Sequence, residues 1–162
     1  MEPEMQLKIY ESIDFYNRYE RLSRKYQLEN RLENYANDKV IGLYDELGYT
    51  AKHIKKNNFF KMEEKIDNVK FNFHTCLKYG NAELIMDAFD TKKDEFLLGG
   101  PFAGIMKEIE ISKNKEKDGY IRYPKFSNYK DLYEILNTSL SIYEDFKKEV
   151  LKTLLGRSKS IV

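Results

Sequence analysis

Cysteine is nearly absent from the sequence: Cys76 is the only one among 162 residues. A single thiol cannot form an intramolecular disulfide, and it cannot supply the several thiolates of a cysteine-rich zinc site. A lone cysteine is ordinary for a protein of the reducing cytosol. The sequence therefore excludes a domain stabilised by its own disulfides and one built around a cysteine-rich metal site.

Long apolar runs and an excess of one charge are missing as well. The longest apolar runs are a few residues, far short of the roughly 20 that span a bilayer, and the acidic start Met1–Glu4 does not match a signal peptide. Charged residues make up 34% of the chain, yet the net charge is only +1. Proteins that bind nucleic acid through its phosphates usually show a basic excess. We therefore expect a cytoplasmic protein without a membrane segment, and the charge balance does not favour nucleic acid as its partner.

Aromatic residues, in contrast, are plentiful. The chain has 13 Tyr and 10 Phe, and 41% of its residues are hydrophobic. A disordered chain would be poor in aromatic residues, and 162 residues is near the usual size of one domain. No internal repeat and no long linker interrupts the sequence. We predict a single folded domain over residues 1–162.

The first 47 residues show apolar positions at helical spacing. One set consists of Met5, Ile9, Ile13, Tyr16 and Tyr19, and a second of Leu28, Leu32, Tyr35, Ala36, Val40, Leu43 and Leu47. At about 100° per residue, the second set is rotated by nearly half a turn from the first. One straight helix would then carry apolar surface on opposite sides. We predict two helices within about 4–47, with a break between about Leu22 and Gln27, and with Gly48 ending the second.

The middle of the chain changes to a period of two. From Val69 to Tyr79, apolar and polar residues alternate, which is typical of a half-buried strand. Asp67-Asn68 and Gly80-Asn81 suit two-residue hairpin turns, and a short strand is expected at Glu95–Leu98. Tyr49–Ile54 is a further candidate strand. We predict an antiparallel meander of three to five strands over about 58–98.

Glycine and proline mark the start of the C-terminal part. We expect Gly99-Gly100-Pro101 to form a turn that leads into a short helix at about 101–111. Pro124 should keep Tyr120–Phe126 extended. Ser127 is a favourable N-cap for a last helix at about 128–155, which Gly156 should end. The helices need a surface for their apolar stripes. The predicted fold is α+β, an antiparallel β-meander packed on one face by the N-terminal helical pair and the C-terminal helix.

The other face of the predicted sheet has a mixed character. Its side chains are Asn72, His74, Lys78, Glu83, Ile85, Asp87 and Phe89. His74 and Cys76 point to the same face because they lie two residues apart on a strand. Their Cα atoms would be about 7 Å apart, which is awkward for the hydrogen bond of a Cys–His catalytic pair. We interpret them as a surface histidine beside an inert thiol, and we expect a partner to bind this face.

Two further groups of residues could carry chemistry. Glu83, Asp87, Asp90 and Asp94 are carboxylates of the kind that hold metal ions, but their spacing matches no metal-binding loop. Gly99-Gly100-Pro101 could open an anion site at a helix start, but phosphate-loop and dinucleotide signatures are missing. The simpler interpretations are a solvated turn and a tight turn that requires glycine. We predict no catalytic residue, no metal and no cofactor.

Three segments carry a family resemblance: Phe71–His74 continuing through Lys78–Leu84, then Leu98–Phe102, then Tyr123–Phe126 leading into the last helix. They resemble small bacterial immunity proteins, which are the cytoplasmic partners that neutralise polymorphic or contact-dependent inhibition toxins. The resemblance implies a protein that is not an enzyme and that binds a cognate toxin domain and blocks its active site. It transfers no functional residue, because the binding surfaces of immunity proteins differ from one another.

Acidic and tyrosine side chains are natural contacts for the basic clefts of nuclease toxins. The predicted partner-binding residues are therefore Tyr79, Glu83, Asp87 and Asp90. Two alternatives stay open. One is a phage- or plasmid-type regulatory protein that binds nucleic acid or a host protein, which a basic stripe on the folded surface would favour. The other is a metal-dependent hydrolase that uses the acidic residues at the strand end.

Overall fold

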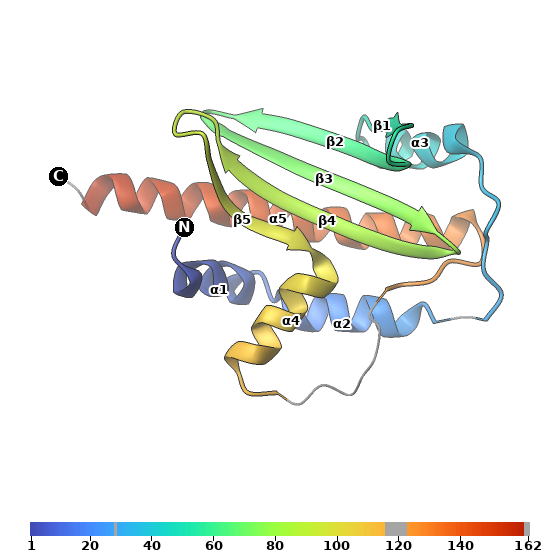
Figure 1. Cartoon of the computed structure of the whole chain (residues 1–162), viewed down its shortest axis with the longest axis horizontal. Coiled ribbons are helices and arrows are strands. Elements are labelled where there is room, and N and C mark those ends of the chain that lie inside the picture. Colours follow the sequence, from blue (N-terminus) through green and yellow to red (C-terminus); the bar gives the residue numbers. More distant parts are fainter. Residues whose placement is uncertain (28, 116–122, 161–162) are drawn as a thin grey trace.

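The chain folds into one antiparallel sheet with a layer of helices on one of its faces (Figure 1). The computed structural model describes residues 1–27, 29–115 and 123–160. In chain order the elements are α1 (Pro3–Ser12), α2 (Phe15–Lys25), α3 (Asn37–Glu46), β1 (Lys52–Ile54), β2 (Phe59–Ile66), β3 (Val69–Lys78), β4 (Asn81–Asp90), β5 (Glu95–Pro101), α4 (Phe102–Ser112) and α5 (Tyr129–Ser160).

The five strands pair in the order β1-β2-β3-β4-β5, each antiparallel to the next. The turns between them are short. Asp67 has φ 54° in the β2–β3 turn, and Tyr79 and Gly80 have φ 56° and 71° in the β3–β4 turn. In the β3–β4 turn, positive φ at both central residues matches the twist of the flanking strands. This turn lies one residue before the predicted Gly80-Asn81, because Asn81 already pairs with Lys78 in the sheet. The predicted α+β fold with an antiparallel meander is confirmed, and the candidate strand at 49–54 is present as β1.

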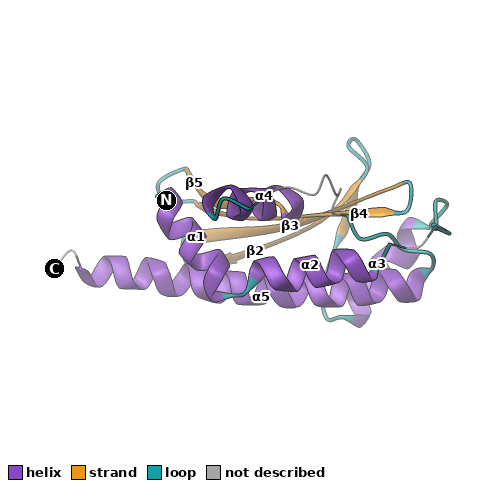
Figure 2. Ribbon diagram, turned by 90° about the horizontal axis from the view of Figure 1, so that it is seen from below, coloured by secondary structure: helices purple, strands orange, loops and turns teal. Residues whose placement is uncertain are grey.

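One face of the sheet is buried against the helices. In Figure 2, α2, α3 and α5 lie along one side of the strands, and none of the described helices crosses the other side. The buried face carries Phe60, Met62, Phe71, Phe73, Thr75, Leu77, Leu84 and Met86. Helix α4 follows β5 directly and packs beside α2. The prediction that the N-terminal helices and the C-terminal helix pack on one face is confirmed.

The N-terminal region contains three helices, so the prediction of two was wrong. The chain turns at Asp14, whose φ of 52° is incompatible with a continuing helix. This turn brings Ile13 and Phe15, on either side of Asp14, into the core together. The one predicted break, between about Leu22 and Gln27, is correct, because α2 ends at Lys25.

Residues 29–36, predicted as helix, are irregular. Their polar groups bond to distant parts of the chain instead. The Leu32 N–H donates to the Phe126 carbonyl over 2.9 Å, and the Tyr35 hydroxyl donates to the Leu77 carbonyl over 2.8 Å. These tertiary hydrogen bonds replace the bonds of a helical turn. Leu28, part of the predicted stripe, lies outside the described residues, as do residues 120–122 of the predicted extended segment.

The Gly99-Gly100-Pro101 segment is strand rather than turn, which corrects the prediction. Gly99, Gly100 and Pro101 pair with Asp87, Met86 and Ile85 of β4, in that order. Gly99 has φ 122°, and a Cβ atom there would lie 2.2 Å from the Met86 carbonyl oxygen. Glycine is required because the two backbones approach closely.

The ends of α5 also differ from the prediction. Asn128 rather than Ser127 caps the helix, since the Asp131 N–H donates to the Asn128 side-chain oxygen over 2.8 Å. The helix continues through Gly156 to Ser160. A glycine in a helix costs only about 1 kcal/mol relative to alanine, so the helix can pass through it.

Candidate functional site

The open sheet face is the side of the sheet that no described helix covers (Figure 2). Alternate residues of each strand point to it. Its side chains, taken from the register, are Lys52, Ile54, Phe59, Lys61, Glu63, Lys65, Lys70, Asn72, His74, Cys76, Lys78, Asn81, Glu83, Ile85, Asp87, Phe89 and Phe96. Phe96 is 53% exposed. The face therefore combines apolar, hydrogen-bonding and charged groups, as the sequence predicted.

Charge is divided across the open sheet face. Lys52, Lys61, Lys65 and Lys70 lie on β1, β2 and β3, with one acid, Glu63, among them. The Glu63 carboxylate lies 2.9 Å from the Lys61 ammonium and 3.8 Å from that of Lys70. A hydrogen bond from Lys61 and the nearby positive charges lower the pKa of Glu63. The β1–β3 side of the face is therefore basic.

The β4 side of the open sheet face is acidic, because Glu83 and Asp87 point outward there. They lie four residues apart along one strand, or about 13 Å. Asp87 accepts a hydrogen bond of 2.6 Å from the Asn72 side-chain amide. A partner that meets both sides of this face needs a complementary division of charge.

Three buried polar atoms on the open sheet face have no hydrogen-bond partner among the described residues. They are the side-chain oxygens of Asn72 and Asn81 and Nε2 of His74. The His74 ring lies 4.8 Å from the ring of Phe59. Burial lowers the pKa of His74, so the ring is neutral at pH 7 and presents either a donor or an acceptor at Nε2. Because these atoms are buried, a partner could bond to them only after neighbouring side chains move aside.

The structure brings together two of the four predicted contact residues. Glu83 and Asp87 share the open sheet face, both on β4. Tyr79 is 65% exposed but lies in the β3–β4 turn, beyond one end of that face. Asp90 lies at the opposite end of β4, about 30 Å away, where it accepts hydrogen bonds from the Lys92 and Lys93 N–H groups. The four residues therefore do not form one compact site.

The candidate chemical groups do not assemble into a reactive centre in the described ranges. Burial, followed by the charge of Glu83, raises the pKa of the Cys76 thiol, which disfavours the nucleophilic thiolate. Among residues 1–27, 29–115 and 123–160, no group of three or more His, Cys, Asp or Glu is placed to hold a metal ion. Gly99 and Gly100 are paired within the sheet, so their N–H groups do not form an anion-binding loop.

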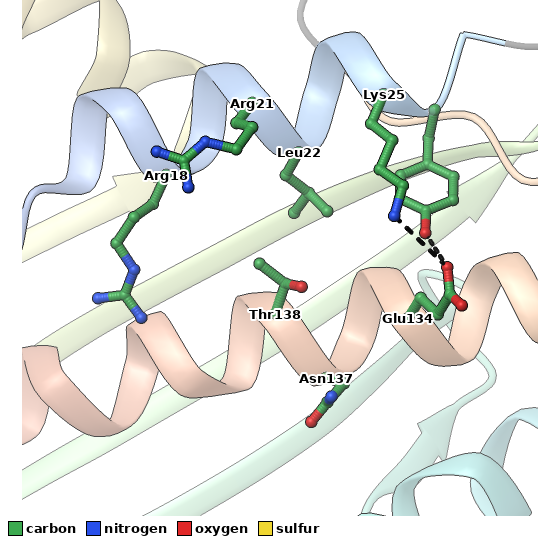
Figure 3. Close-up of a pocket in the computed structure, with 8 residues that line it drawn as sticks. Arg18, Arg21, Leu22, Lys25, Glu134, Asn137 and Thr138 are labelled. Carbon is green, nitrogen blue, oxygen red and sulfur yellow. Dashed lines mark hydrogen bonds and ion pairs between the residues drawn. The ribbon is translucent and has the colours of Figure 1, made fainter.

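A second surface, which the sequence interpretation missed, lies between α2 and α5 (Figure 3). The α2–α5 groove has a volume of about 360 Å³ and is lined by Arg18, Arg21, Leu22, Lys25, Tyr26, Glu134, Asn137 and Thr138. In Figure 3 the strands run behind the two helices, so the groove opens away from the sheet. The signal for it was present: Arg18, Arg21 and Lys25 follow one another at helical spacing.

Comparison of the chain with protein-family models, with curated proteins and with solved structures found no match. Within the described residues, every helix is too short or too polar to cross a membrane.

Proposed function

We propose that this chain is a protein-binding domain of the immunity type, which uses the open sheet face to bind a toxin domain and block its active site. The observation that carries the proposal is the exposure and the incomplete hydrogen bonding of that face. It is free of described helices, it carries Phe96, which is 53% exposed, and Asn72 and His74 each have a buried, unsatisfied polar atom just beneath it. An exposed aromatic side chain favours binding of a partner surface that covers it.

The size of the face suits a specific protein partner. Its three long strands have 8 to 10 residues each, and β5 has 7. At the usual strand dimensions, four such strands present roughly 20 Å by 30 Å, or about 600 Å². A standard protein interface buries about 800 Å² on each partner. The open sheet face supplies roughly three quarters of that area, and the exposed Tyr79 in the adjoining β3–β4 turn extends it.

The charges of the face indicate how a toxin would be oriented. Glu83 and Asp87 on β4 complement a basic cleft, such as the one in which a nuclease holds its substrate. Lys61, Lys65 and Lys70 would face an acidic rim on the same partner. Occupation of the cleft by β4 would exclude the substrate sterically and by charge.

The test uses the toxin-like domain encoded next to this chain in its own genome. That domain is expressed in a bacterial host with the wild-type chain, and restored growth together with a stable purified complex is expected. The double variant Glu83→Lys/Asp87→Lys should fold but fail to protect. The matched control is Asp45→Lys/Glu46→Lys, which makes the same charge change at two exposed positions at the C-terminal end of α3. This control should protect fully. Absence of a toxin-like neighbour, or equal protection by both double variants, would contradict the proposal.

A further inference from the structure

The α2–α5 groove contains some groups that are already paired (Figure 3). Arg18 donates from Nη1 to the Asp145 carboxylate over 2.8 Å and to the Ile13 carbonyl over 3.0 Å, and from Nη2 to the Ser141 hydroxyl over 3.2 Å. Arg18 is therefore a fixed part of the wall.

Glu134 is paired as well. Its carboxylate accepts a hydrogen bond from the Tyr26 hydroxyl, and that bond lowers the pKa of Glu134. The Lys25 ammonium lies 3.9 Å from the same carboxylate, beyond hydrogen-bond distance. Lys25 thus keeps its three donors available to another acceptor.

Other groups in the groove have no partner within the described part of the chain. The Arg21 guanidinium on α2 is exposed, and no hydrogen bond or ion pair with a described residue involves it. Asn137 and Thr138 line the groove from α5 and are unpaired in the same sense. Buried Leu22 forms the floor between the two walls. The groove thus offers a guanidinium, an ammonium, an amide and a hydroxyl around an apolar floor.

We propose that the α2–α5 groove is a second binding site, and that it takes an acidic peptide segment of a protein partner. A carboxylate of the peptide pairs with Arg21 and Lys25, since charge-assisted hydrogen bonds to a carboxylate are the strongest that these groups make. Asn137 and Thr138 bind the backbone or a polar side chain of the peptide. An apolar side chain of the peptide lies over Leu22.

The charges favour a peptide over a nucleic acid. Glu134 lies inside the groove and Asp145 lies at its Arg18 end. These carboxylates repel a strand that carries a phosphate at every nucleotide, whereas a peptide can place an uncharged or basic residue opposite them. Strong phosphate binding also requires several cations along a track. Of the cations that line this groove, Arg18 is bonded to Asp145 and Lys25 lies in an ion pair with Glu134.

This site is independent of the proposed function. The groove lies on the outer side of the helical layer, and the open sheet face lies on the other side of the sheet (Figures 2 and 3). Both could be occupied at once, and failure of the toxin test leaves the groove unaffected.

The experiment measures fluorescence anisotropy of a fluorescein-labelled peptide of alternating Glu and Leu at low salt. Saturable binding is expected, and it should weaken about tenfold or more in Arg21→Ala/Lys25→Ala, because both charge-assisted contacts are lost. That variant leaves the Arg18–Asp145 and Tyr26–Glu134 bonds in place, and its thermal unfolding should match the wild type. The matched control Lys92→Ala/Lys93→Ala removes the same charge from the β4–β5 turn and should bind as the wild type does.

Three outcomes would overturn the inference. They are no saturable binding of the peptide, equal binding by a peptide with Gln in place of Glu, and binding that is unchanged in Arg21→Ala/Lys25→Ala. Tighter binding of a single-stranded oligonucleotide of matched length, lost in the same double variant, would assign the groove to nucleic acid instead.

Discussion

The hydrogen bond between Tyr44 and Thr75 joins α3 to the centre of the sheet, and its removal should cost measurable stability. The two hydroxyl oxygens lie 2.5 Å apart, and both side chains are 0% exposed. Burial raises the pKa of Tyr44, so its hydroxyl stays protonated and able to donate. Neither group can reach water if the other is lost.

The expected magnitude follows from this burial. Thr75→Val keeps the β-branched shape of the side chain and removes only the hydroxyl. The Tyr44 hydroxyl is then buried without a partner, which costs about 1–3 kcal/mol. The added methyl contact recovers less than about 1 kcal/mol. We expect the free energy of unfolding to fall by about 1–2 kcal/mol, and Tyr44→Phe to cost a similar amount by leaving the Thr75 hydroxyl unpaired.

The double variant Tyr44→Phe/Thr75→Val makes the test specific. It removes both polar groups at once, and replacement of both partners by apolar groups is nearly neutral. The sum of the two single losses should therefore exceed the loss in the double variant by about 2–4 kcal/mol. Urea unfolding followed by far-ultraviolet circular dichroism gives each value, and an unchanged denaturant slope shows that the folded and unfolded states are comparable.

The reasoning would be refuted by either of two results. One is a Thr75→Val variant whose unfolding midpoint equals that of the wild type. The other is a double variant whose loss equals the sum of the single losses, because the two hydroxyls would then act independently.

Three further predictions concern stability. Lys147, whose side chain is 7% exposed, pairs with Glu64 and Glu144. Since those acids are partly exposed, Lys147→Met should lower the free energy of unfolding by about 1–2 kcal/mol. Lys152→Met, in the exposed pair with Glu149, should lower it by almost nothing, and urea unfolding measures both. Gly99→Ala should lower the melting temperature more than Gly100→Ala, since both have positive φ but only the Cβ at Gly99 meets the β4 backbone; an equal loss would contradict the packing argument. Burial lowers the pKa of His74. As the pH falls below about 6.5, the unfolded state therefore takes up a proton before the folded state does, and stability is lost from there downward. His74→Gln should flatten that part of a plot of melting temperature against pH.

The strands could be predicted because their information is local. Alternation from Val69 to Tyr79 and the turn at Asp67 fix which residues share a face, and the structure agrees. The N-terminal helices could not be predicted to the same degree. Asp14 adopts its left-handed conformation, and residues 29–36 leave the helix, because contacts with α5, β3 and residue 126 outweigh local preference.

The candidate sites divide in the same way. Period two in β4 placed Glu83 and Asp87 on one face, but it could not show that Tyr79 and Asp90 lie at opposite ends of it. The α2–α5 groove depends on two helices that are more than 100 residues apart, as in the bond from Tyr26 to Glu134 with its separation of 108 residues. No local pattern contains that pairing.

The sequence by itself determined the antiparallel meander, the uncovered mixed face and the absence of a disulfide framework, because these follow from side-chain alternation, turn residues and composition. Only the tertiary structure decided that Gly99 belongs to a strand, that the open sheet face has a basic and an acidic side, and that Arg21 and Lys25 line one groove with Asn137 and Thr138. These features depend on which distant segments pack together, and packing is set by the burial of the whole core rather than by any one stretch of residues.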